Sequence, residues 1–179
     1  MWILSPDQKR LQSASKNRTI VIIYILTALL TLLYALVSPL SENSILAVSF
    51  STIALVTLIN VYRTKTIDTV NSYKPLIKLL VTLALIIAPQ GDLSIIAMII
   101  GVYFVSSSLI YLHFAKQSHK KEEYIFWNVR VLNNLLLATF TLIQIETISF
   151  TLLVFFIILT YLADIYSIYK NSTHSFIRP

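Results

Sequence analysis

Residues 75–116 read PLIKLLVTLALIIAPQGDLSIIAMIIGVYFVSSSLIYLHFAK, two apolar runs separated by a tight PQGD turn at positions 89–92. The second run contains no Asp, Glu, Lys or Arg over the 22 residues from 93 to 114. A helix rises about 1.5 Å per residue, so this run is long enough to cross a hydrocarbon layer of about 30 Å. The stretch therefore predicts a hairpin of two helices inside a membrane.

The composition of the whole chain agrees with a membrane protein. Of the 179 residues, 56% are hydrophobic and 12% are charged, whereas a soluble domain carries about 25% charged residues. The chain has no cysteine, which excludes disulfides, thiolate nucleophiles and Cys-ligated metals. The net charge of +6 comes from basic residues that flank the apolar runs, a placement typical of membrane proteins rather than of nucleic-acid-binding proteins.

Similar pairs of apolar runs occur on both sides of this stretch, so we expect an all-α membrane protein with six transmembrane helices. The helices form three antiparallel hairpins, at residues 19–62, 75–115 and 124–169. They make up a single membrane domain, residues 19–170.

The two ends of the chain are more polar than the membrane domain. Residues 1–18 are expected to be a cytoplasmic segment with a short interfacial helix over 6–16, since SPDQ at 5–8 has the form of a capping box with proline at the first helical position. Residues 171–179 are expected to form a cytoplasmic tail.

The apolar run at 75–88 is too short for a span, because about 14 helical residues reach only about 21 Å. Two alternatives remain open. The helix begins earlier, near Asp68, with Pro75 as a kink, or it sits where Lys78 extends to the lipid headgroups.

The charges predict the orientation of the chain. All 14 Lys and Arg lie in the N-terminal segment, in the linkers after the second and fourth helices with the adjoining helix ends, or at the C-terminal end. The opposite turns contain one acid each: Glu42, Asp92 and Glu146. The positive-inside rule then places both termini in the cytoplasm of a multi-pass protein of the cell (plasma or inner) membrane. Aromatic residues near the basic side predict an interfacial belt: Tyr62, Tyr73, Tyr111, Tyr124, Trp127, Tyr166 and Tyr169.

The three outward acids have two interpretations. A cluster of like charges can act as a pH sensor. Acids at translocated turns also serve solubility and helix capping, because an acid suits the positive end of the helix dipole. Glu42 and Asp92 each come just before an apolar run, which favours capping.

Two of the turns share a pattern, SPLSENS at 38–44 and APQGDLS at 88–94, and the apolar runs after them end in YRTK and HFAK. Aligning the turns also superimposes small residues at spacing i, i+4, which allow helices to approach closely in lipid. These pairs are Ala47 with Ala97 and Ser51 with Gly101.

Three such two-helix units resemble the HdeD-type acid-resistance membrane protein family over about residues 16–170. The resemblance implies a six-helix inner-membrane protein, connected in some members with acid or envelope stress and without an established catalytic role. The chain departs from that family in having only two glycines, Gly91 and Gly101, and in lacking a proline in its third turn, IQIETIS at 143–149.

Arg130 and Asp164 are the most informative polar residues of the fifth and sixth predicted helices. Counted from the outer turn they lie about 21 and 26 Å deep, within one helical turn of each other, so they can pair near the cytoplasmic boundary. The predicted intramembrane polar cluster consists of Asn60, Arg130, Asn133, Asn134 and Asp164. The pair is interpreted either as part of a proton or ion relay, or as a hydrated structural pair with Arg130 extended to phosphates.

No catalytic, cofactor or metal site is predicted. The three histidines are scattered without a second ligand at i+3 or i+4, and P-loop, Rossmann and HExxH motifs are absent from the sequence. The expected partners are the lipid bilayer and a membrane-protein partner or second copy of the chain, and no nucleic acid is expected.

Two functions follow from these patterns. The first is a non-enzymatic membrane protein of the HdeD type, acting in envelope or acid stress or as an accessory subunit of a membrane complex. The alternative is a small transporter or channel that uses the polar cluster between the fifth and sixth helices.

Overall fold

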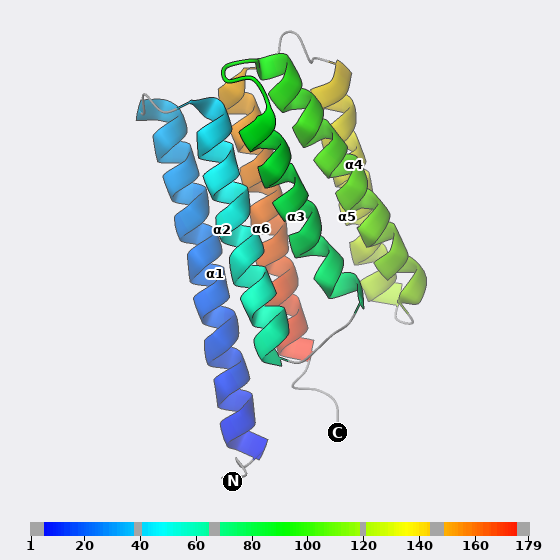
Figure 1. The fold of residues 1–179 in the computed structure, drawn as a ribbon. Coiled ribbons are helices and arrows are strands. Elements are labelled where there is room, and N and C mark those ends of the chain that lie inside the picture. The colour runs from blue at the N-terminus through cyan, green and yellow to red at the C-terminus, as the bar shows by residue number, and fades with distance from the viewer. Residues whose placement is uncertain (1–5, 38–40, 65–68, 119–120, 144–148, 175–179) are drawn as a thin grey trace.

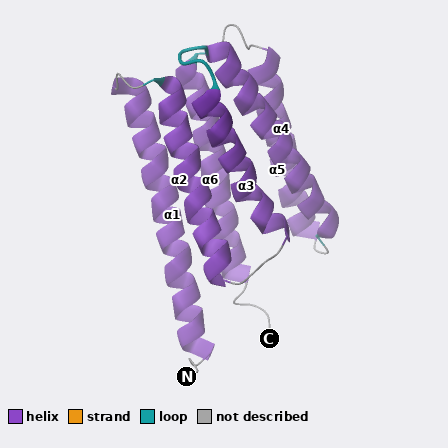
Figure 2. Cartoon of the chain, viewed as in Figure 1, coloured by secondary structure: helices purple, strands orange, loops and turns teal. Residues whose placement is uncertain are grey.

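The computed structural model describes residues 6–37, 41–64, 69–118, 121–143 and 149–174, which form six α-helices and no strand. Figure 1 shows these helices side by side in one elongated bundle, and Figure 2 shows that this described part of the chain is helix apart from short loops. The all-α class is therefore confirmed. The helices are α1 (Pro6–Val37), α2 (Glu42–Thr64), α3 (Thr69–Ile87), α4 (Leu93–Gln117), α5 (Lys121–Ile143) and α6 (Phe150–His174).

The two ends of the bundle differ from the expectation. A separate interfacial helix over 6–16 is not formed, because α1 runs unbroken from Pro6 to Val37 and extends beyond its neighbours in Figure 1. The first four residues of the expected tail, 171–174, are helical, since α6 continues to His174. No proline or glycine interrupts either helix after its first residue, and these are the residues that end helices most effectively.

The third helix follows the first of the two alternatives. α3 begins at Thr69 and contains Pro75 in its interior. Proline has no backbone N–H, so the carbonyl one turn earlier loses its usual helical partner at this point. The second alternative, with Lys78 at the headgroups, is wrong, because Lys78 is buried inside the bundle.

The most extensive helix contacts join α4 to α5, α2 to α3, and α1 to α6. Each of these pairs takes its helices from two different predicted hairpins. In the α4–α5 pair, a Cβ on Gly101 would lie only 2.6 Å from Leu142 Cδ2. In the α2–α3 pair, Asn43 Nδ2 lies 3.2 Å from each of three carbonyl oxygens at the end of α3, those of Leu85, Ala88 and Pro89.

The interior and the surface of the bundle are both apolar. Large side chains such as Phe50, Phe104 and Ile157 are fully buried, while every helix also has large apolar side chains that are exposed. Among the residues that the structure describes, four helical segments are long and apolar enough to span a membrane: Arg18–Val37, Glu42–Ile59, Leu93–Gln117 and Lys121–Ile143. An apolar outer surface over most of a bundle is unusual for a protein in water.

Candidate functional site: a buried charge cluster

Asp164 of α6 lies at the centre of a buried charge cluster, which we define as Lys78, Tyr111, Arg130 and Asp164. Arg130 Nη2 lies 2.8 Å from Asp164 Oδ1, and the Tyr111 hydroxyl donates to the same oxygen at 2.9 Å. Lys78 Nζ donates to Oδ2 at 3.2 Å. These contacts come from α3, α4 and α5, so a single carboxylate connects four helices.

Arg130 makes two further contacts that fix its position. Nη1 donates to the backbone carbonyl of Ala163 at 2.8 Å, and Nη2 also lies 2.8 Å from the Tyr111 hydroxyl. Its guanidinium lies 4.3 Å from the centroid of the Tyr111 ring. The pairing of Arg130 with Asp164 that the sequence predicts is therefore present, and only 5% of the arginine is exposed.

Lys78 turns inward because of its place on α3. Val81, Thr82 and Leu85 follow it at i+3, i+4 and i+7, and all of them are buried. This spacing defines one helix face, so Lys78 belongs to the face that packs into the bundle. Only 4% of Lys78 is exposed, and its charge is compensated by Asp164 rather than by lipid headgroups.

A layer of tyrosines continues the cluster toward α1 and α2. The Tyr161 hydroxyl lies 2.9 Å from Ser49 Oγ, and its ring meets the Tyr24 ring edge-on at 5.8 Å. Lys78 Nζ lies 3.4 Å from the Tyr24 hydroxyl, which in turn lies 3.4 Å from Thr57 Oγ1. Polar side chains from all six helices are therefore connected through this centre.

Lys74 adds a third cation, one helical turn before Lys78. Its ammonium lies over three aromatic rings, at 4.8 Å from the centroid of Tyr111, 5.1 Å from Phe114 and 5.5 Å from Trp127. A narrow pocket opens beside it. The residues that line this pocket are Lys74, Ile77, Lys78, Tyr103, Ser107, Ile110, Tyr111 and Asp164.

The charges at this centre do not balance. Lys74, Lys78 and Arg130 provide three positive charges, and Asp164 is the only buried carboxylate in the described part of the chain. Burying an ion costs several kcal/mol unless a counter-ion and hydrogen bonds offset the loss of water. The centre therefore holds an excess of positive charge that the described residues do not neutralise.

The structure separates the other predicted members of the polar cluster. Asn134 is buried on the same side of α5 as Arg130, whereas Asn133 is exposed and its assignment to the cluster is wrong. Arg130 and Asn134 are four residues apart and share the face of α5 that packs on α4 and α6. The side chain of Asn60 lies outside the described residues.

The outward acids are also placed only in part. Asp92 caps α4, since its Oδ1 accepts hydrogen bonds from the backbone N–H groups of Ser94 and Ile95 at 3.1 and 3.2 Å. Glu42 is the first residue of α2, where its charge suits the helix dipole. Glu146 lies outside the described residues. The capping interpretation is thus confirmed for Asp92.

Two aromatic residues at the charge cluster were not predicted to belong to it. Tyr111 and Trp127 are assigned above to an interfacial belt, but Tyr111 is 5% exposed and bonded to Asp164, and Trp127 stacks on Tyr111 and Phe114. Tyr73, Tyr124 and Tyr166 are exposed as a belt requires. Within the described ranges, no group of three or more His, Asp or Glu side chains is arranged to hold a metal ion.

Comparison of the chain with protein family models, with curated protein sequences and with solved structures finds no match.

Proposed function

We propose that this protein is an integral membrane protein that crosses the bilayer six times. The support is the distribution of polarity: charged side chains are buried at the centre, and large apolar side chains are exposed on the outside. Such an arrangement suits lipid as the surrounding solvent and is unfavourable in water. Four helical segments meet the length and polarity of a span by themselves. The other two helices, α3 and α6, are less apolar because each contains a buried charge, Lys78 in α3 and Asp164 in α6. These two charges pair with each other, so neither faces the lipid alone.

The proposed topology places both termini in the cytoplasm of a cell (plasma or inner) membrane. α1 begins and α6 ends at the same end of the bundle (Figure 1). The linkers after α2 and α4 and the N-terminal segment carry Lys and Arg, whereas the turns at the opposite end carry none. This asymmetry supports a cytoplasmic basic end. The three hairpins would then be antiparallel repeats, with their turns outside.

For its activity, we propose a small transporter that carries an ion through the polar centre. The observation that carries this proposal is the buried carboxylate of Asp164 among three cations, beside a pocket. Ionisable residues inside spans are costly and commonly belong to ion or substrate paths. The sequence places the polar cluster between α5 and α6, with Asn60 of α2 as a further member, whereas the hydroxyls of Tyr24, Tyr161 and Ser49 extend the polar centre to α1 and α2.

The second candidate is a non-enzymatic protein of the HdeD type, acting in acid or envelope stress or as an accessory subunit. One observation favours it: both oxygens of Asp164 already have partners on α3, α4 and α5, so the cluster holds four helices together without any ligand. The exposed apolar surface is also suitable for a membrane-protein partner or a second copy of the chain.

Reconstitution in liposomes distinguishes the two candidates. The vesicles carry a pH-sensitive and a voltage-sensitive dye, and flux is measured for the parent protein, for Asp164→Asn and for the exposed control Asn133→Gln. Transport predicts flux above that of empty liposomes, which Asp164→Asn abolishes and the control retains. A folded parent protein without flux, whose loss nevertheless lowers survival of the cells in acid, supports the second candidate.

A further inference from the structure

The ammonium of Lys74 has no hydrogen-bonding partner within the described part of the protein. Lys78 and Arg130 both bond to Asp164, whereas no hydrogen bond or ion pair joins Lys74 Nζ to any other described residue. The three aromatic rings around it attract its charge but accept no conventional hydrogen bond. A lysine ammonium carries three N–H donors, so Lys74 has donors available for a small molecule.

The pocket beside Lys74 has the size of one water molecule. About 10 Å³ is open to the centre of a water-sized sphere, and a single buried water needs about 10–15 Å³ on this scale. A buried water also needs about two to four polar partners. The polar side chains that line the pocket are Lys74, Lys78, Tyr103, Ser107, Tyr111 and Asp164.

The ammonium of Lys74 is within reach of such a water. Asn43 Oδ1 is the only side-chain nitrogen or oxygen in the described ranges that is shielded from water and also lacks a partner. Lys74 Nζ lacks a partner but is not shielded in this way, so a water-sized molecule can touch it.

We propose that this pocket holds one water molecule, which accepts a hydrogen bond from Lys74, and that the ion carried through the polar centre is the proton. The water site rests on the size and polarity of the pocket. The choice of the proton rests in addition on the transport function proposed above, and it names the substrate class for that function.

The pocket suits a proton better than a larger or permanently charged species. A solute larger than water has no room in it. A metal cation would lie among three positive charges, next to a carboxylate that already accepts from Lys78, Tyr111 and Arg130, and an anion would lie against that carboxylate. A proton needs no space of its own, because it passes between hydrogen-bonded groups by exchange.

Lys74 can take part in such an exchange. One Nζ–H bond breaks as its proton passes to the water oxygen, and the water releases one of its own protons toward the cytoplasm. The water is thereby restored, and Lys74 is left as a neutral amine whose electron pair accepts the next proton. The charged and titratable groups around Lys74 are Lys78 on α3, Tyr103 and Tyr111 on α4, Arg130 on α5 and Asp164 on α6.

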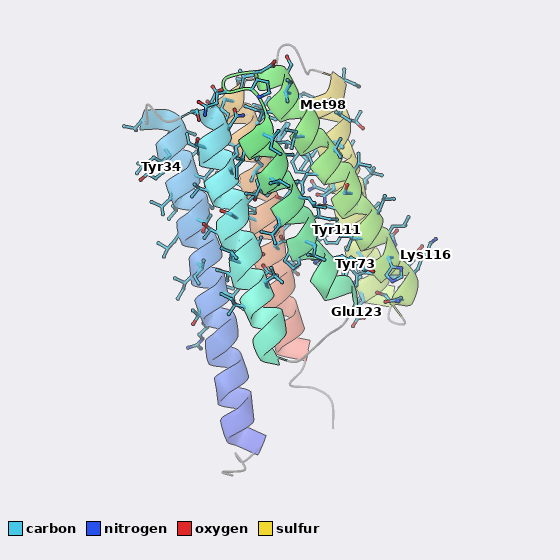
Figure 3. All side chains as sticks on the ribbon, viewed as in Figure 1. Tyr34, Tyr73, Met98, Tyr111, Lys116 and Glu123 are labelled. Atoms are coloured by element: carbon cyan, nitrogen blue, oxygen red, sulfur yellow. The ribbon has the colours of Figure 1, made fainter. Side chains whose placement is uncertain are left out.

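Tyr111 marks the depth of the pocket in the bundle. It lies nearer than Met98 to the end that carries Lys116 and Glu123 (Figure 3). That end is the proposed cytoplasmic one, so the water would exchange protons with the cytoplasm.

Radiolytic footprinting tests for the water without using transport. Hydroxyl radicals formed from bound water by an X-ray beam modify the side chains beside it, and mass spectrometry locates the products. For the full chain in phosphatidylcholine nanodiscs, we expect modification of Tyr103 and Tyr111, which line the pocket and are each 5% exposed. Tyr161 is fully buried and does not line the pocket, so it should stay unmodified.

Filling the pocket distinguishes the bound water from bulk water. Ser107→Val replaces a hydroxyl by two methyl groups and should lower the modification of both pocket tyrosines to the level of Tyr161. Ser106→Val is the matched control, since Ser106 is the neighbouring residue, is partly exposed and does not line the pocket. Where Ser107→Val does not fold, as judged by circular dichroism and gel filtration, Ser107→Thr takes its place with one added methyl group.

Flux in liposomes tests the role of Lys74. The parent protein should carry protons but not sodium, potassium or chloride. Lys74→Met should abolish the proton flux, and so should Lys74→Arg, because arginine keeps the charge but does not release a proton in proteins. Lys116→Arg is the matched control at an exposed lysine near the same end of the bundle and should retain the flux.

Each part of the proposal can fail separately. Unmodified Tyr103 and Tyr111, or equal modification in the parent and Ser107→Val, overturn the water site. Flux of a metal ion or chloride in the parent, or full proton flux in Lys74→Arg, overturns the assignment of the proton. A footprint of the water in a protein without any flux rejects the transport function, and the proton with it, but keeps the water site.

Discussion

Lys78 and Asp164 are 86 residues apart in the sequence, yet the lysine Nζ lies 3.2 Å from the aspartate Oδ2 inside the bundle. Arg130 holds the other oxygen of the same carboxylate. The arrangement is asymmetric, because one acid serves two cations. Removing the acid and removing a cation should therefore have different costs.

Asp164→Asn should be the more damaging change at this pair. It leaves Lys78 and Arg130 buried without a counter-ion, and breaking a buried ion pair in this way costs about 3–5 kcal/mol. Lys78→Met should cost less, since Asp164 keeps Arg130 and Tyr111 as partners. Thermal unfolding in detergent and abundance in the membrane measure the order. Equal losses in the two variants would contradict the asymmetry.

Gly101 should accept only a very small side chain. An added Cβ would meet Leu142 Cδ2 at 2.6 Å and Cγ at 2.7 Å. These atoms belong to a flexible and partly exposed side chain, so Leu142 can turn away from an alanine. Gly101→Leu overfills the contact between α4 and α5 and should cost about 1–3 kcal/mol. Adding Leu142→Ala should recover part of that loss in thermal unfolding, and an unchanged loss would show that the two side chains do not meet.

Tyr161→Phe and Ser49→Ala test the tyrosine layer. Their hydroxyl oxygens are 2.9 Å apart and both residues are buried. Hydrogen bonds between helices in membrane proteins have coupling energies of about 0.6 kcal/mol, so we expect a coupling of that order in a double-mutant cycle of unfolding free energies. Strictly additive effects of the two substitutions would show that the bond does not contribute.

The topology can be tested with single cysteines, because the chain has none of its own. Gln90 lies in the turn before α4 and Gln117 at the end of α4, and both are exposed. A membrane-impermeant maleimide should label Gln90→Cys in intact cells and Gln117→Cys only after the membrane is opened. The opposite pattern would invert the proposed orientation.

The sequence alone predicts those contacts of the charge cluster that follow from how far each residue lies along its own helix. Arg130 and Asp164 lie at similar depths when residues are counted from the outer turn, and this count is sufficient to pair them. Lys78 was missed although its spacing to Val81, Thr82 and Leu85 marks one helix face. Its place near the start of a short apolar run suggested a surface position.

Other members depend on which side of a helix faces its neighbours. Tyr111 and Trp127 lie near the basic end of the bundle, where an interfacial belt is expected. However, α3 packs beside α4, and the ammonium of Lys74 on α3 lies over both rings. Asn133 follows Arg130 closely in the sequence and yet faces outward, because the contact with α4 selects the side of α5 that holds Arg130 and Asn134. Such choices arise from helix packing, which a single sequence does not specify.

The position of Asp164 on α6 has a consequence for biogenesis. In the proposed topology, α3 and α5 leave the ribosome and reach the membrane before α6, so Lys78 and Arg130 would enter without their carboxylate. The insertion intermediate would then carry unpaired cations that resist burial in lipid until the sixth helix arrives. Quality-control proteases that recognise unpaired charge would have their opportunity in that interval, and a nascent chain stalled before residue 164 would be their preferred target.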